Sequence, residues 1–397
     1  MKNNWEIKTL REVCEFRRGL TYSKKDEASL SKNAILRANN ITLAANTLNF
    51  DDIRYISDDV IIPQEKKLVK GSVMICTASG SRSHLGKVAF IDKDYDYAFG
   101  GFMGLLVPNS EIIDPKYFFV ILTSGQFRDH INSLTSGANI NNLKFSQIKD
   151  YQVTVPPLLE QKRIVGILDE KFKAIEELKK VTEAQIQDAK ELFESRHNEI
   201  FEPNPDIKNI KTFGEVCKIE GGSQPAKSFF INEPKKDYTR LIQVRDYRTD
   251  KFVTYIPKIK ARRFCSKTDI MIGRYGPPIF GIFNGLEGAY NVALMKAVPD
   301  ETVLDKNYFF WFLKNKKLHT FVEKSSQRAA GQSGVRKELL YQYPVPVPEI
   351  TIQKKVVREL DMLSKKTNEL EQVFQKKITS LEELKKSYLE QAFAGKL

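Results

Sequence analysis

The stretch VTVPPLLEQKRIV, residues 153–165, has a near copy, VPVPEITIQKKVV, at residues 345–357, and the offset is 192 positions. In both copies a short run rich in valine ends at proline. A glutamine- and lysine-containing sequence of helical character follows it. Similar segments at a fixed offset indicate an internal repeat. The stretch therefore predicts that each half of the chain carries a globular portion followed by a long helix.

Two further pairs of segments give the length of the repeat. KTLREVC at 8–14 returns as KTFGEVC at 211–217, and DPKYFF at 114–119 returns as DKNYFF at 305–310, in the same order. A repeat unit of roughly 200 residues is too long for a solenoid and indicates a tandem duplication of one domain and one helix. The expected boundaries are 1–157 for the first domain, 158–202 for the central helix, 203–348 for the second domain and 349–397 for the C-terminal helix.

Each globular portion alternates short β-rich runs with turn residues, which predicts α+β domains. Asp114 before Pro115 is typical of a helix start. The aromatic run 117–119 after it, repeated at 308–312, is expected to form a buried helix face. The expected strands are 34–37, 72–77, 87–92 and 98–108 in the first portion, and 240–245, 269–273, 279–283 and 292–298 in the second.

The two long helices carry apolar residues in a 3.5-residue register, which is typical of a coiled coil. A helix with one apolar stripe must bury it, and the other helix of the same chain is the simplest partner. About 35 residues at 1.5 Å each would make a spacer of roughly 50 Å. The register residues are Val165, Leu168, Phe172, Ile175, Ile186, Ala189, Phe193 and Ile200 in the first helix, and Leu360, Leu363, Leu370, Phe374, Leu381, Leu384 and Tyr388 in the second.

The charge of the chain lies in its globular portions. The 397 residues include 63 Lys and Arg against 50 Asp and Glu, a formal net charge of +13. The helical segments 158–200 and 349–397 are neutral together, with 18 basic and 18 acidic residues, so the rest of the chain carries the whole excess. A basic surface of this kind favours a polyanionic partner.

Several classes of site lack their motifs in the sequence. The four cysteines and four histidines are scattered, which argues against a structural zinc site and, for the cysteines, fits a reducing compartment. There is no GxxxxGK[ST] phosphate loop and no Asn/Asp-Pro-Pro-aromatic motif of an amino-methyltransferase. The N-terminal sequence has no apolar signal core, and no stretch is long enough for a membrane span. We therefore expect a non-catalytic, cytoplasmic protein without a bound metal.

Polar clusters beside glycines are the candidate DNA contacts, because glycine lets the backbone approach a ligand closely. Arg suits guanine edges, Asn and Gln suit adenine edges, and Ser, Thr and Lys suit phosphates. The clusters differ between the two halves, which predicts two different target sequences. The candidates are Arg17, Arg18, Arg37, Asn39, Asn40, Ser79, Ser81, Arg82, Lys87, Asn139, Asn141 and Lys144 in the first half, and Ser223, Gln224, Arg245, Tyr247, Arg274, Tyr275, Gln327, Arg328, Gln332 and Arg336 in the second.

Four stretches together resemble the specificity (S) subunits of Type I restriction–modification systems over essentially the whole chain. They are VPPLLEQKRIV followed by Leu168-Asp169, the ending 381–397, GGSQP at 221–225, and IMIGRYG at 270–276. The first half departs from the family at residues 17–21, where RRGLT lacks the double glycine.

The resemblance implies two tandem mixed α/β target recognition domains separated by two long conserved helices that form an antiparallel coiled coil. It also implies binding of a bipartite target in double-stranded DNA and association with two modification (methyltransferase) subunits, with restriction (translocase and nuclease) subunits as further partners. S-adenosylmethionine and ATP would then be bound by the partner subunits and not by this chain.

Two other interpretations remain open at this point. One is a fused methyltransferase or nuclease, against which the missing motifs argue. The other is a non-restriction RNA-binding or coiled-coil scaffold protein, and a preference for duplex DNA over RNA would separate it from the specificity subunit.

Overall fold

The computed structural model describes the chain except residues 1–4, 43–44, 136–141, 203–208, 276–278 and 327–333. The chain forms two compact units. Unit 1 comprises residues 1–182 together with 375–397, and unit 2 comprises residues 183–374. Two long helices, α5 (Leu158–Ile200) and α10 (Ile350–Phe393), each contribute one part to unit 1 and another part to unit 2.

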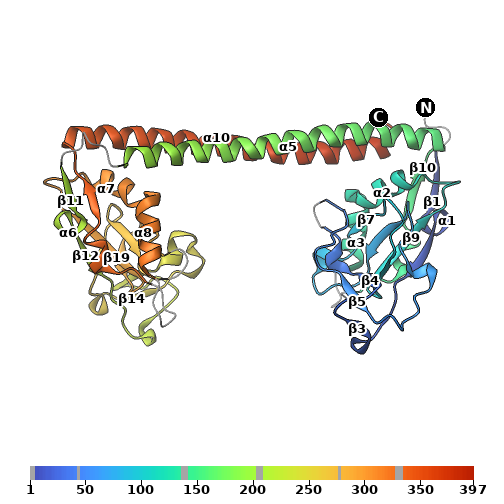
Figure 1. Ribbon diagram of the computed structural model, residues 1–397, viewed down its shortest axis with the longest axis horizontal. Coiled ribbons are helices and arrows are strands. Elements are labelled where there is room, and N and C mark those ends of the chain that lie inside the picture. Colours follow the sequence, from blue (N-terminus) through green and yellow to red (C-terminus); the bar gives the residue numbers. More distant parts are fainter. Residues whose placement is uncertain (1–4, 43–44, 136–141, 203–208, 276–278, 327–333) are drawn as a thin grey trace. The chain divides into compact units, whose positions relative to one another are not determined.

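Unit 1 contains two four-stranded sheets and a two-stranded ribbon. The ribbon, β1 with β10, lies next to the long helices, and β3 and β5 lie at the far end of the unit (Figure 1). The first sheet has the order β2-β9-β6-β7 and the second has the order β3-β5-β4-β8, in which β4 and β8 are parallel. The strands are β1 (Glu6–Thr9), β2 (Cys14–Arg18), β3 (Glu27–Ala28), β4 (Asn33–Leu36), β5 (Arg54–Ile56), β6 (Val73–Cys76), β7 (Val88–Phe90), β8 (Tyr97–Phe99), β9 (Met103–Pro108) and β10 (Gln152–Val155). The short helices are α1 (Leu10–Val13), α2 (Pro115–Thr123), α3 (Gly125–Thr135) and α4 (Phe145–Ile148).

Unit 2 repeats this architecture, which confirms the duplication. Its sheets have the orders β12-β19-β16-β17 and β14-β13-β18-β15, and β11 pairs with β20. The strands are β11 (Ile210–Thr212), β12 (Cys217–Gly221), β13 (Tyr238–Ile242), β14 (Tyr255–Pro257), β15 (Phe264–Cys265), β16 (Ile270–Gly273), β17 (Ile282–Phe283), β18 (Gly288–Tyr290), β19 (Leu294–Pro299) and β20 (Pro344–Pro346). The helices are α6 (Phe213–Val216), α7 (Lys306–Leu313), α8 (Lys316–Ser326) and α9 (Lys337–Leu340).

Three strand predictions need correction. The strand expected over 279–283 is reduced to β17, because residues 279–280 form a turn. The strand expected over 98–108 is two strands, β8 and β9, which belong to different sheets. Gly100 and Gly101 form the turn between them, and Met103 N–H donates to the Gly100 carbonyl at 2.8 Å. The strand expected to reach Arg245 ends at Ile242, because residues 244–247 form a short 3-10 helix.

The predicted helix start at Asp114 is confirmed, and its counterpart is Asp305. The Asp114 carboxylate accepts hydrogen bonds from the backbone N–H groups of Lys116 and Tyr117, as an N-cap does. The aromatic residues that follow pack inward, and Tyr117, Phe118, Tyr308 and Phe309 are fully buried. The expectation that these runs form buried helix faces is therefore confirmed, except that Phe119 and Phe310 are only half-buried.

Within each unit, the α5 and α10 segments run antiparallel. In unit 1, Glu176 pairs with Lys385 at 3.1 Å and Lys179 with Glu382 at 3.0 Å, so rising numbers on α5 meet falling numbers on α10. In unit 2, Lys190 pairs with Glu371 and Arg196 with Glu359, both at 2.7 Å. Antiparallel pairing of the two helices is therefore present in both units.

The predicted apolar register is only partly correct. Val165, Leu168 and Ile175 are buried as expected, and so are Leu360 and Leu381. Leu370 and Leu384 are exposed, whereas the unpredicted Ile378, Leu389 and Ala392 are buried. Leu389 and Ala392 belong to the main apolar core of unit 1, which also contains Leu168. The helices therefore pack on their domains as well as on each other, and a pure coiled-coil register does not describe them.

A buried glutamine fastens the start of each long helix to its domain. The Gln161 side chain donates to the carbonyls of Pro156 (2.7 Å) and Ile112 (3.1 Å) and accepts from Asp114 N–H (2.7 Å). The Gln353 side chain makes the same three bonds, to Pro348 (2.7 Å), Val303 (2.9 Å) and Asp305 N–H (2.7 Å). We call each set a glutamine clamp. It satisfies three backbone groups that otherwise lack a partner next to the helix N-terminus.

Candidate nucleic-acid interface

In unit 1, four chain segments meet at a small polar depression that we call the first corner. Its lining includes Arg18 from β2, Thr77 after β6, Phe102 from the β8–β9 turn, and Asn142 and Lys144 before α4, around a cavity of about 300 Å³. Thr77 N–H donates to the Phe102 carbonyl at 2.9 Å, and Leu143 N–H donates to the Thr77 carbonyl at 2.6 Å. These backbone bonds hold the turn and the α4 loop against the end of β6.

Unit 2 builds a second corner with the same backbone bonds. Arg274 N–H donates to the Ala293 carbonyl at 2.8 Å, and Val335 N–H donates to the Arg274 carbonyl at 3.2 Å. Arg274 thus takes the place of Thr77, Ala293 that of Phe102, and Arg336, beside Val335, that of Lys144. Gly221 takes the place of Arg18, since β2–β9 and β12–β19 share one register. The two corners therefore have one frame and different side chains.

A glycine at each corner allows the backbone to pass close to the turn. A Cβ on Gly19 would lie 2.0 Å from the Gly100 carbonyl oxygen, and a Cβ on Gly222 would lie 1.8 Å from that of Asn291. A Cβ on Gly221 would meet nothing within 4 Å. Of the double glycine, the second is therefore the one that the frame requires. In the first half, Gly19 is equivalent to Gly222, so the glycine that the frame requires is present. The first half departs from the double glycine only at Arg18, which is equivalent to Gly221, where a side chain has open space.

A second pair of equivalent positions follows β4 and β13. Arg37 N–H donates to the side-chain oxygen of Asn40 at 2.7 Å, and Gln243 N–H donates to the carboxylate of Asp246 at 3.0 Å. Arg37 and Asn39 are therefore matched by Gln243 and Arg245. Burial raises the pKa of the Asp246 carboxyl, while the Gln243 N–H bond and the nearby Arg240 and Arg245 oppose that shift.

The predicted basic residues differ in how far their charge is already neutralised. Arg17 pairs with Glu15 at 2.7 Å and Arg37 with Asp52 at 3.0 Å. Among the described residues no ion pair involves Arg18, Lys144, Arg274 or Arg336. Burial, together with the Arg274 charge, lowers the pKa of the Lys337 ammonium beside the second corner. These four cations lie at the two corners, where an anionic ligand would meet them.

Two predicted DNA contacts are structural instead. Lys87 is only 3% exposed, and its ammonium donates to the Ile41 carbonyl at 2.8 Å. Asn40 is 1% exposed, and its amide donates to the Asn49 and Asp52 carbonyls. Both are wrong as surface contacts, because each side chain is buried and bonds to backbone carbonyls of loops inside unit 1.

The other predicted residues are placed as follows. Tyr247 is half-buried and stacks on Phe283, with ring centroids 4.5 Å apart. Ser79, Ser81 and Ser223 are at least partly exposed, as are Gln224 and Tyr275. The side chain of Arg82 is outside the described part of the chain. Asn139, Asn141, Gln327, Arg328 and Gln332 also lie outside the described residues and stay predictions.

Sequence reasoning missed Phe102 as a candidate contact, whereas Asn142 and Gln243 belong to polar clusters that the sequence already indicates. Phe102 follows a double glycine, which is a turn signal, but the run around it reads as one buried strand. For Gln243 the structure adds its equivalence to Arg37, through the matching bonds that follow β13 and β4.

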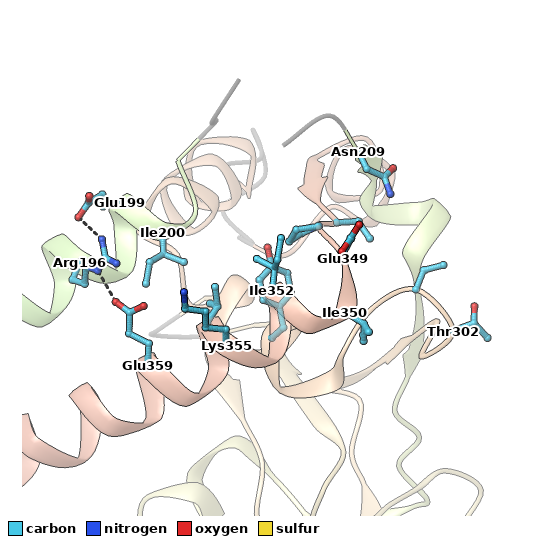
Figure 2. A pocket seen from close by; sticks show the side chains of 15 residues that line it. Arg196, Glu199, Ile200, Asn209, Thr302, Glu349, Ile350, Ile352, Lys355 and Glu359 are labelled. Atoms are coloured by element: carbon cyan, nitrogen blue, oxygen red, sulfur yellow. Dashed lines mark hydrogen bonds and ion pairs between the residues drawn. The ribbon is translucent and has the colours of Figure 1, made fainter. Parts of the chain in front are cut away.

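A larger cavity, of about 860 Å³, lies in unit 2 where the end of α5 meets the start of α10, and it does not suit DNA. Figure 2 shows Arg196 between Glu199 and Glu359, to which it is bonded at 3.0 and 2.7 Å. The charged lining residues are Arg196 and Lys355 against Glu199, Glu349 and Glu359. A net acidic lining would repel phosphates.

The described residues offer no group of three or more His, Cys, Asp or Glu side chains that could hold a metal ion. None of the helices in the described part of the chain has the length and apolar character that a membrane crossing needs. The four cysteines are all buried, and burial raises their thiol pKa values.

Comparison with known proteins identifies the same family as the sequence resemblance. The family model described as "Type I restriction modification DNA specificity domain" matches residues 2–187 and 205–380. The chain is 25% identical over 435 residues to the Type I restriction enzyme EcoKI specificity subunit of Escherichia coli strain K12, covering all of this chain and 90% of that protein. It is 30% identical over 172 residues to the StySPI specificity subunit of Salmonella potsdam, covering 43% of this chain and 36% of that one.

Solved structures agree on the fold. A chain from a study of complex assembly and conformational transition of the type I R-M system matches with a TM-score of 0.81 at 17% identity, over 100% of this chain and 99% of that one. The HsdS subunit from Thermoanaerobacter tengcongensis matches with a TM-score of 0.61 at 17% identity, over 100% and 98%. With the family model matching both halves, the chain belongs to the family of Type I restriction–modification DNA specificity proteins.

Proposed function

We propose that this chain is the non-catalytic specificity subunit of a Type I system, and that it recognises a bipartite sequence in double-stranded DNA through its two corners. One observation carries the proposal: the same backbone frame occurs twice and presents Arg18, Thr77 and Lys144 in one unit and Gly221, Arg274 and Arg336 in the other. Side chains that differ on an identical frame suit two half-sites of different sequence.

The proposal extends to the partners. Two modification subunits would bind this chain and bring S-adenosylmethionine to the target adenines, and restriction subunits would bring ATP. Exposed apolar side chains on the long helices support a protein partner there: Leu192, Met362 and Val373 in unit 2 are more than half exposed. Such side chains leave apolar area that a bound subunit would remove from water.

The salt dependence of DNA affinity tests the role of the cations at the corners. The logarithm of the binding constant is expected to fall linearly with the logarithm of salt concentration, by about 0.9 per phosphate neutralised. Lys144→Ala is expected to reduce this slope by about one unit. The matched control is Arg17→Ala, which should change the slope less because Arg17 already pairs with Glu15. A binding constant independent of salt, or equal slopes for wild type and Lys144→Ala, would contradict the role of these cations.

Exchange of one domain tests independent reading of the half-sites. Replacing residues 210–345 with the corresponding domain of another family member is expected to change one half of the methylated sequence and leave the other half unchanged. The measurement is sequencing of methylated adenines in cells that express the hybrid with its modification subunits. A change in both halves would show that the two domains do not read separately.

A further inference from the structure

We propose that Phe102 reads the 5-methyl group of a thymine in the half-site bound by the first corner. This inference rests on the proposed function, and it adds a residue and a chemical group to it. Phe102 is 73% exposed and belongs to none of the apolar clusters formed by the described residues of unit 1. An aromatic ring that is open to solvent gives a favourable free energy when a ligand covers it.

The turn that carries Phe102 is held by a set of backbone bonds. The Phe102 carbonyl accepts from Thr77 N–H (2.9 Å), the Thr77 hydroxyl (2.9 Å) and Ala78 N–H (3.1 Å). Gly100 N–H donates to the Leu36 carbonyl at 2.9 Å, and Leu20 N–H donates to the Phe99 carbonyl at 2.7 Å. The backbone that carries the ring is therefore fixed, and only the side-chain torsions of Phe102 have to be ordered on binding.

Phe102 lines two depressions. One is the first corner, with Arg18, Asn142 and Lys144. The other, of about 580 Å³, has a mainly apolar lining, in which Lys24 has no ion pair among the described residues and Arg37 is paired with Asp52. An aromatic side chain with hydrogen-bond donors on both sides matches a DNA groove, where phosphates and base edges offer acceptors.

In duplex DNA the apolar group displayed on the major-groove surface is the thymine methyl, and aromatic side chains contact it. The alternative, insertion between base steps, would require the duplex to unstack. In the second corner the equivalent position is Ala293, whose carbonyl accepts from Arg274 N–H as that of Phe102 does from Thr77. Phe102 therefore gives the first corner a preference for thymine that the second corner, with Ala293 at the equivalent position, does not have.

The test uses the full-length chain with its modification subunits, after domain exchange has assigned the half-sites. Each thymine of the first half-site, on either strand, is replaced in turn by deoxyuridine, which removes only the methyl group. For the wild type we expect one position at which affinity falls about fourfold, as for loss of one buried methyl. Phe102→Ala is expected to bind thymine and deoxyuridine equally at that position. Leu30→Ala, which truncates another exposed apolar side chain of unit 1, is the matched control and should keep the wild-type response.

The outcomes are separable. Equal wild-type affinity for every substituted DNA, a first half-site without thymine, or an unchanged methyl dependence in Phe102→Ala would each overturn the role of Phe102. Loss of modification subunits from Phe102→Ala, with its methyl dependence unaltered, would make the ring a protein contact and overturn the inference too. Failure of the wild-type complex to bind duplex DNA would instead refute the proposed function.

Discussion

Gly222→Ala is expected to destabilise unit 2 severely, whereas Gly221→Ala should leave its stability almost unchanged. A Cβ on residue 222 would lie 1.8 Å from the Asn291 carbonyl oxygen and 2.6 Å from its carbon, and both atoms belong to the backbone. The turn before β19 would have to move, which should cost about 3 kcal/mol or more. The measurement is the free energy of unfolding from urea titration of the purified protein.

The neighbouring glycine, Gly221, provides the matched control for Gly222→Ala. Gly221 is adjacent in sequence, and a Cβ there would have open space. Gly19→Ala should reproduce the effect in unit 1, since its Cβ would lie 2.0 Å from the Gly100 carbonyl oxygen. If Gly221→Ala and Gly222→Ala lowered the stability equally, the close approach at Asn291 would not be what demands glycine there.

Gln161→Leu is expected to cost about 3–5 kcal/mol of stability. Leucine is similar in size but leaves three backbone groups of the glutamine clamp without a partner, the carbonyls of Ile112 and Pro156 and the N–H of Asp114. Each unsatisfied buried polar group costs about 1–3 kcal/mol. The measurement is again the free energy of unfolding, and Gln353→Leu should behave alike because its clamp has the same three bonds.

Gln187→Leu is the matched control for the clamp. Gln187 is also a glutamine of α5, but it is exposed and bonds only to Glu191 of the same helix, at 2.6 Å. Its replacement should change the stability by no more than about 0.5 kcal/mol. Comparable losses for Gln161→Leu and Gln187→Leu would mean that the clamp contributes nothing beyond helix propensity.

The duplicated fold was predictable from sequence because its signals are local. The Asp114 and Asp305 helix starts and the aromatic faces after them depend on neighbours within one turn. The buried residues of α10 were less predictable, since Leu389 packs into a domain core whose strands lie far away in sequence. A heptad register assumes that a helix contacts only another helix, and that assumption fails here.

The candidate site was predictable as a set of basic and polar loops, but the sequence could not sort its members. Arg18, Lys144, Arg274 and Arg336 do lie at the two corners, whereas Lys87 and Asn40 are buried. Sequence alone does not distinguish a lysine that meets a ligand from one that bonds an internal carbonyl. The same holds for Phe102, since an exposed aromatic and a core aromatic look alike until the turn beside it is known.

The division of the chain has a consequence for its biosynthesis. Unit 2 is one continuous stretch, 183–374, but unit 1 needs residues 375–397, which supply Leu389 and Ala392 to its core. Near that end, Arg163 donates to the Leu397 carbonyl at 2.7 Å, and Trp5 lies against Gly395. The domain that leaves the ribosome first therefore cannot complete its core until residues 375–397 emerge, whereas the second can fold as it is made. During synthesis, chaperones and proteases could therefore bind the incomplete N-terminal domain. A truncation after residue 374 would damage unit 1, although most of that unit lies at the opposite end of the sequence.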